Sequence, residues 1–166
     1  MYANRTSQEV RQGLARLLSP PLLEAKPSHR RIPLSRANHV RGWHPIRPGH
    51  GAVAFESKLE SHFLTLVALL APDLAVQSQP VTITYLLDGC RRRYTPDFLV
   101  QMPLVPEVLG PLGFGLQTYV EIKPLARAQS LGIDWLMRLA ALRSLGSAVT
   151  VVTDEDLALL ADKGAA

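Results

Sequence analysis

The stretch that decides the fold consists of two acidic segments, YTPDF at residues 94–98 and YVEIKP at residues 119–124. β-Branched and aromatic residues surround both acids, which favours a β-strand at each place. Alternate side chains of a strand share a face, so Glu121 and Lys123 should point the same way while Ile122 points into the core. We therefore expect adjacent strands to bring two carboxylates and an ammonium together.

This combination is the one that a Mg²⁺-dependent phosphodiester nuclease needs. Carboxylate oxygens hold a hard cation, which makes Asp97 and Glu121 candidate ligands. The ammonium of Lys123 can orient the attacking water and offset charge that develops on the phosphate. The pattern alone is only moderately specific, because Pro-Asp is common in turns and Glu-x-Lys is common on solvated strand faces.

Composition limits the classes of protein to consider. A chain of 166 residues is long enough for one domain with a real core. Its single cysteine, Cys90, cannot form a disulfide or a thiolate zinc site within the chain, which favours a reducing compartment. The N-terminus lacks the apolar run of a signal peptide, and charged residues or proline interrupt every apolar stretch. We expect a soluble, cytoplasmic protein that does not associate with a membrane.

Charge is distributed unevenly along the chain. Residues 1–49 contain nine Lys and Arg residues but two acids, whereas the remainder contains nine Lys and Arg residues and twelve acids. A basic arm on a mildly acidic body indicates a polyanion partner such as double-stranded DNA. A solvated N-terminal extension would have the same composition.

Local patterns predict the order of the elements. The capping box of Thr6 and Glu9 begins a helix that extends to Leu18, and Pro, Arg and His residues then predict an extended arm over residues 19–50. The elements expected after the arm are a strand at 53–55, a helix at 56–70, a hairpin of strands 81–87 and 90–101 around the Asp88-Gly89 turn, an apolar loop at 103–115, a strand at 116–123, a helix at 126–145, a strand at 148–153 and a last helix from 154.

This order resembles the core of the restriction-endonuclease-like PD-(D/E)XK fold, a mixed β-sheet flanked by helices. Three further segments extend the resemblance: RGWHP at 41–45 leading into VAFESKLE at 53–60, QPVTITY at 79–85, and RRYTPDF at 92–98. In this order and spacing, the chain resembles the TnsA family, the nuclease subunit of heteromeric bacterial transposases. The resemblance covers residues 36–153.

The resemblance implies roles for particular residues. Glu60 matches the catalytic carboxylate on the helix before the strands. Asp97 matches the metal-binding aspartate, Glu121 the second carboxylate and Lys123 the lysine. These acids, with the carbonyl of Ile122, would hold Mg²⁺, with Mn²⁺ as a substitute.

Other candidates have competing interpretations. Glu56 is the alternative to Glu60, because residues four apart share a helix face; a charge favoured by the helix dipole would also explain it. Gln79 matches the Gln-Pro element of the family, but it could simply bond the end of a strand. The candidates for DNA binding are five arginines: Arg36, Arg41, Arg91, Arg92 and Arg93. The three consecutive arginines at 91–93 could instead protect a solvated strand edge.

The resemblance also implies an activity. It predicts an endonuclease that cuts the 5′, non-transferred strand at transposon ends in the bacterial cytoplasm, with a DDE transposase subunit and an AAA+ ATPase regulator as partners. The chain would divide into a helix and basic arm over 1–45 and a nuclease domain over 46–166. Another PD-(D/E)XK nuclease, acting in phage biology, repair or junction resolution, would keep the same acids. A DNA-clamping assembly subunit without activity would keep the fold.

Overall fold

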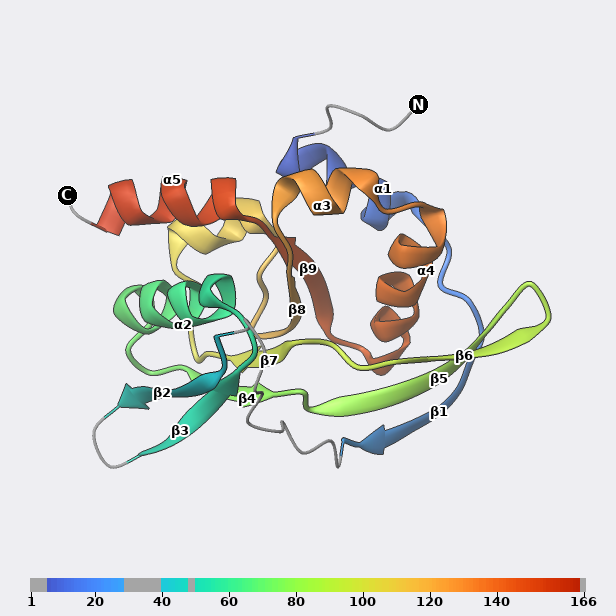
Figure 1. Ribbon diagram of the computed structural model, residues 1–166, viewed down its shortest axis with the longest axis horizontal. Helices are drawn as coiled ribbons and strands as arrows, with labels where there is room; N and C mark the ends of the chain where they lie inside the picture. The colour runs from blue at the N-terminus through green and yellow to red at the C-terminus, as the bar shows by residue number, and fades with distance from the viewer. Residues whose placement is uncertain (1–5, 29–39, 48–49, 165–166) are drawn as a thin grey trace.

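The structure is a computed structural model that describes residues 6–28, 40–47 and 50–164, and it is a mixed α/β protein (Figure 1). Its elements in chain order are α1 (Ser7–Arg16), β1 (Leu22–Pro27), β2 (Gly42–Arg47), β3 (His50–Phe55), α2 (Lys58–Leu70), β4 (Ala75–Ser78), β5 (Val81–Leu87), β6 (Cys90–Tyr94), β7 (Phe98–Gln101), the 3-10 helix η1 (Glu107–Leu112), β8 (Gln117–Ile122), α3 (Leu125–Ser130), α4 (Ile133–Leu142), the 3-10 helix η2 (Arg143–Leu145), β9 (Ala148–Val152) and α5 (Asp154–Gly164).

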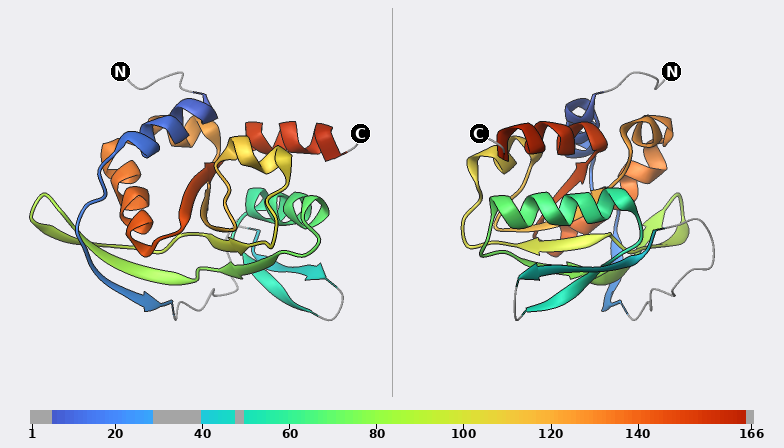
Figure 2. Two further views of the ribbon diagram at one scale, coloured as in Figure 1. Left: turned by 180° about the vertical axis from the view of Figure 1, so that it is seen from behind. Right: turned by 60° about the vertical axis from the view of Figure 1, so that its left-hand side comes forward.

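A four-stranded sheet in the order β4-β7-β8-β9 forms the centre of the fold. Strands β7 and β8 are antiparallel, whereas β8 and β9 are parallel and are connected through α3 and α4. Alternate residues of these strands enter two different cores. Phe98 and Val120 pack in the core that α2 and α5 cover, whereas Tyr119 and Val151 pack in the core that α1 and α4 cover. The views in Figures 1 and 2 show the central strands between these two groups of helices.

A second sheet, in the order β1-β5-β6, extends beside the central one. The predicted hairpin is confirmed, because β5 and β6 pair around Asp88 and Gly89, whose φ angles are 49° and 73°. Both angles are positive, as the tight turn of a two-residue hairpin requires. A separate hairpin pairs β2 with β3.

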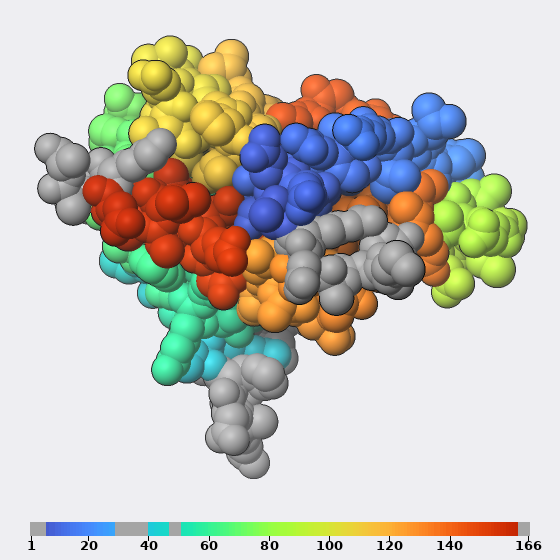
Figure 3. Space-filling view, turned by 90° about the horizontal axis from the view of Figure 1, so that it is seen from above, coloured from blue at the N-terminus to red at the C-terminus, as the bar shows by residue number. Residues whose placement is uncertain are grey.

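The prediction of an extended arm over residues 19–50 is wrong for the described part of that segment. Residues 22–27 form β1, which pairs with β5, and residues 42–47 form β2, so a boundary between residues 45 and 46 would fall inside a strand. Helix α1 also belongs to the body, because Val10 and Leu14 are buried in the same core as α4. Figure 3 shows α1 and α5 side by side across one face. The basic residues of the N-terminal segment therefore belong in part to the folded body of the protein and not to a separate arm.

The structure also differs from other local expectations. The strand expected over 90–101 is two strands in different sheets, because the chain leaves β6 at Tyr94 and enters β7 only at Phe98. Strand β4 was missed. The helix expected over 126–145 is divided at Gly132. The apolar loop at 103–115 folds over the core, where Leu109 is fully buried.

No helix in the described ranges combines the length and the apolar character needed to cross a bilayer.

Candidate active site

Strand pairing brings the two acidic segments together. Phe98 of β7 pairs with Val120 of β8, and one further step along the same antiparallel register places Asp97 opposite Glu121. The main-chain N–H of Ile122 donates a hydrogen bond of 2.7 Å to Oδ2 of Asp97. The two carboxylates expected on adjacent strands therefore lie together at one end of the central strands, where β7 begins and β8 ends.

Glu121 lies at the centre of this site. It is buried, and its Oε1 is 3.1 Å from Nζ of Lys123, so the expectation that these two side chains point the same way is confirmed. Its other oxygen, Oε2, accepts a hydrogen bond from the hydroxyl of Tyr94. Both oxygens of the carboxylate are thus oriented by the protein.

Tyr94 is a site residue that the sequence analysis missed. The turn at residues 88–89 sets the hairpin register, which places Tyr94 opposite the buried residue Ile83. A tyrosine on a buried strand face needs a hydrogen-bond partner for its hydroxyl. That register was the available signal, and the partner is Glu121.

Glu60 lies in the first turn of α2. Ser57 is the N-cap, and its hydroxyl donates a hydrogen bond of 2.9 Å to Oε1 of Glu60. The main-chain N–H of Glu56 donates a bond of 2.8 Å to Oε2. These contacts fix the carboxylate and stabilise the start of the helix. Glu56 precedes the N-cap, so the expectation that Glu56 and Glu60 share a helix face is wrong.

The three carboxylates influence one another electrostatically. Burial raises the pKa of Asp97 well above its ordinary value, and the charges of Glu121 and Glu60 raise it further. The hydrogen bond from Ile122 opposes this increase. Burial also raises the pKa of Glu60, to which the charge of Glu121 adds. Negative charges that are gathered out of water repel one another, so the site favours a compensating cation.

Lys123 supplies one such positive charge. Burial lowers its pKa, but the charges of Glu121 and Asp97 more than compensate, so the pKa of Lys123 is raised overall. Lys123 is therefore held as an ammonium.

Burial raises the pKa of Tyr94 well above its ordinary value, and the neighbouring carboxylates act in the same direction. Tyr94 is thus a permanent hydrogen-bond donor.

The donor set fits a hard divalent cation. Asp97 and Glu121 offer carboxylate oxygens, and each oxygen that already accepts a hydrogen bond has a second lone pair. In the described ranges, no group of three or more His, Cys, Asp and Glu side chains is arranged to hold a metal ion. Asp97 and Glu121, which share one end of the paired strands, are the residues that could hold such an ion.

Gln79 contacts Asp97 through its main chain. Its main-chain N–H donates a hydrogen bond of 2.8 Å to the carbonyl of Asp97. Its φ angle of 46° is in the left-handed region, which a residue with a side chain adopts at a cost. Its buried Oε1 has no hydrogen-bond partner within the described residues. Strain and an unpaired acceptor beside an acid are typical of functional positions.

The candidate DNA-binding arginines that the structure describes lie in two separate places. Arg36 lies outside the described residues. Arg41 directly precedes β2 and is partly buried. Arg91, Arg92 and Arg93 are exposed on β6, where side chains alternate between the two faces.

Comparison with known proteins adds no relative, because no protein-family model, no curated protein and no solved structure matches the chain. The resemblance to the TnsA family stays a prediction.

Proposed function

We propose that this chain is a Mg²⁺-dependent DNA endonuclease with a PD-(D/E)XK fold. The observation that carries the proposal is the β7–β8 pairing, which sets Asp97 opposite Glu121 with Lys123 ion-paired to Glu121. Mutually repelling carboxylates beside a lysine, at the end of the two central strands of a mixed sheet, suit the hydrolysis of a phosphodiester. A purely structural cluster has no need for a buried and a partly buried acid so close together.

The residues have distinct roles in the proposed reaction, which is in-line attack of water on phosphorus. A Mg²⁺ ion bound by Asp97 and Glu121, with the carbonyl of Ile122, would supply positive charge to the phosphate oxygens and lower the pKa of a bound water. Lys123 orients the nucleophile and offsets charge in the transition state. Glu60 accepts a hydrogen bond from water at the site, and Mn²⁺ would serve as a substitute ion.

The resemblance to the TnsA family suggests the biological setting. The substrate would be double-stranded DNA at transposon ends, and the cut would fall on the 5′, non-transferred strand. A DDE transposase subunit would process the other strand, and an AAA+ ATPase regulator would license both reactions in the bacterial cytoplasm. Recognition of the end sequence would belong to the transposase.

The test is a nicking assay on duplex transposon ends labelled on one strand at a time. The full chain is combined with its transposase and ATPase partners, with Mg²⁺ or with EDTA. Asp97→Asn and Glu121→Gln each remove one charge from the site, whereas Glu107→Gln removes one from an exposed position on η1 and serves as the matched control. We expect nicking of the 5′ strand by the control and the wild type alone, and only with Mg²⁺.

Other outcomes identify the rival functions. Cleavage of branched or non-transposon DNA without the transposase would favour another nuclease of the same fold. DNA binding that both site variants retain, with no metal-dependent cleavage by the wild type, would favour a clamping subunit. Full nicking activity in Asp97→Asn or Glu121→Gln would exclude the proposed site.

A further inference from the structure

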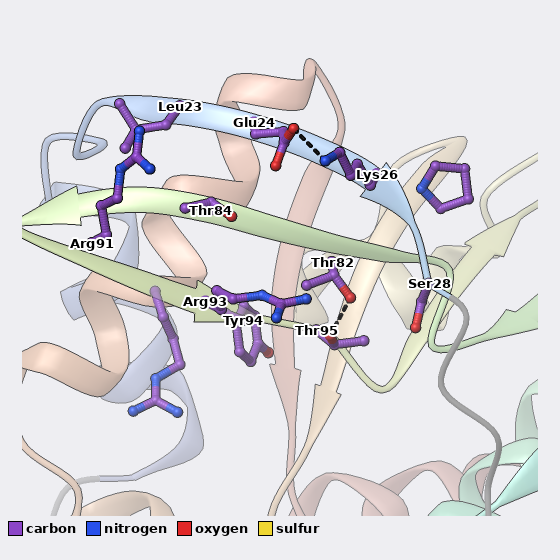
Figure 4. A pocket seen from close by; sticks show the side chains of 12 residues that line it. Leu23, Glu24, Lys26, Ser28, Thr82, Thr84, Arg91, Arg93, Tyr94 and Thr95 are labelled. Atoms are coloured by element: carbon purple, nitrogen blue, oxygen red, sulfur yellow. Dashed lines mark hydrogen bonds and ion pairs between the residues drawn. The ribbon is translucent and has the colours of Figure 1, made fainter.

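A hollow of about 1370 Å³ lies along the β1-β5-β6 sheet and around the edge of β6 (Figure 4). Four of the side chains that line it are basic and one is acidic: Lys26, Arg91, Arg93, Arg138 and Glu24. Hydroxyls of Thr82, Thr84 and Thr95 lie between them. The hollow is therefore positive and rich in hydrogen-bonding groups. We call it the basic groove.

Strand geometry selects which arginines of β6 enter the groove. Arg93 pairs with Thr84, whose side chain lines the groove, and Arg91 is two residues away on the same face. Arg92 pairs with Tyr85, which is buried against α4, so Arg92 points to the opposite face. Arg91 and Arg93 thus lie on the groove face of β6, whereas Arg92 lies on the other face, together with Tyr94 and Arg138.

Three of the four groove cations have no ion pair with any residue that the structure describes. Within the described residues, Arg91 and Arg93 form no ion pair, and both are exposed. Arg138 on α4 is partly buried, its Nε has no hydrogen-bond partner there, and its guanidinium carbon lies 5.7 Å from the centre of the Tyr94 ring. Lys26 differs, because it pairs with Glu24 at 2.6 Å. An uncompensated guanidinium is a ready donor to phosphate.

Tyr94 connects the groove to the carboxylates. Its ring lines the groove beside Arg138, and its hydroxyl donates to Glu121. A phosphodiester chain that lies in the groove therefore passes within one side chain of the candidate active site. The intervening segment contains Thr95 and leads directly to Asp97.

We propose that the basic groove binds the sugar–phosphate backbone of duplex DNA next to the scissile phosphate. The inference rests on the proposed function for the identity of the polyanion. Arg91 and Arg93 contact successive phosphates, and the threonine hydroxyls add neutral hydrogen bonds. Such contacts set the position of the duplex without reading its sequence. The groove thus fixes which phosphodiester reaches Asp97 and Glu121.

The test uses the full chain, a fluorescein-labelled DNA duplex and Ca²⁺ in place of Mg²⁺ to prevent cleavage. Fluorescence anisotropy measures affinity across a series of salt concentrations. Arg91→Gln and Arg93→Gln each remove a groove cation, whereas Arg92→Gln removes the same charge from the other face. We expect each groove variant to reduce the log–log salt slope by roughly 0.9 and Arg92→Gln to leave it unchanged. Thermal melts of all three establish that they are folded.

Equal effects of the three substitutions would overturn the groove, because net charge alone would then explain binding. An unchanged slope in both groove variants, or no duplex binding by the wild type at low salt, would overturn it as well. A separate Mg²⁺ nicking assay on the wild type tests the proposed function. If binding depends on the groove but the wild type does not nick DNA, the proposed nuclease is rejected and the groove is kept. If the wild type nicks DNA but the salt slopes of the groove variants are unchanged, the groove is rejected and the proposed nuclease is kept.

Discussion

Oδ2 of Asp97 accepts a hydrogen bond of 2.7 Å from the main-chain N–H of Ile122, which joins the first acid of the site to the strand that carries the second. Asp97 therefore stabilises the sheet as well as being a candidate metal ligand. The same bond favours the ionised carboxylate, whereas burial and the charge of Glu121 favour the neutral one. These opposing effects allow stability measurements to test the site independently of activity.

Substitutions at Asp97 should separate its charge from its hydrogen bond. Asp97→Asn keeps an acceptor for the N–H of Ile122 and removes the repulsion, so its free energy of unfolding without divalent cations should equal or exceed that of the wild type. Asp97→Ala leaves this N–H without an acceptor and should be less stable than Asp97→Asn by about 1–3 kcal/mol. Chemical denaturation measures both. An alanine variant as stable as the asparagine variant would contradict the structural role.

Tyr94→Phe should destabilise the protein through Glu121. The substitution removes the hydroxyl that donates to a buried carboxylate, which costs about 1–3 kcal/mol in the free energy of unfolding. Tyr119→Phe, on the same strand as Glu121, removes a hydroxyl that makes no hydrogen bond within the described residues and is the matched control. Equal denaturation midpoints for the two variants would show that the Tyr94 bond contributes nothing.

The stability of the metal-free protein should decrease as pH rises above about 4, the ordinary range of carboxyl groups. The pKa values of Asp97 and Glu60 are raised in the folded state, so their contribution is complete below the unfolded values and is lost as pH passes through the folded ones. Each group changes the free energy of unfolding by at most about 1.4 kcal/mol per pH unit. Thermal melts over a pH series measure the slope.

Two controls accompany the pH series. Asp97→Asn should flatten the slope, whereas Glu107→Gln, at an exposed position, should not. Mg²⁺ or Mn²⁺ should raise the melting temperature, and more so at high pH, because the ion binds the ionised carboxylates. A cation effect that is independent of pH and survives in Asp97→Asn would place the ion elsewhere.

Lys123→Ala should affect both stability and turnover. The ion pair at 3.1 Å is partly exposed on the lysine side, so its loss should cost about 1–2 kcal/mol, most of it from leaving Glu121 without its cation. Turnover should fall on the order of 10²–10³-fold, because the ammonium acts in the transition state. Nicking assays and denaturation together decide the role. Normal turnover in a destabilised variant would make Lys123 structural.

Gln79→Gly should raise stability and lower activity. Glycine adopts the left-handed conformation at no steric cost, so relief of strain should contribute about 1 kcal/mol. Asp88→Gly relieves a similar φ of 49° at the exposed hairpin turn and is the matched control, with a stability gain but unchanged nicking. Unchanged activity in Gln79→Gly would assign the glutamine to the strand end alone.

Local sequence patterns determined much of the fold, because they depend on neighbouring residues. The alternation around Glu121 and Lys123 predicts a strand with both side chains on one face, and this is observed. The Asp88-Gly89 turn predicts the hairpin and therefore the position of Tyr94. The capping box at Thr6 and Glu9 likewise forms as expected.

Only the tertiary structure decided which strands meet. The Pro, Arg and His content of residues 19–50 concealed β1, an edge strand whose side chains are mostly exposed. The partner of Tyr94 depends on β6 lying beside the end of β8, 27 residues away in sequence. The assignment of Arg91 and Arg93, but not Arg92, to one groove depends on pairing with β5. Such contacts are long-range, and a sequence determines them only through the packing of the whole chain.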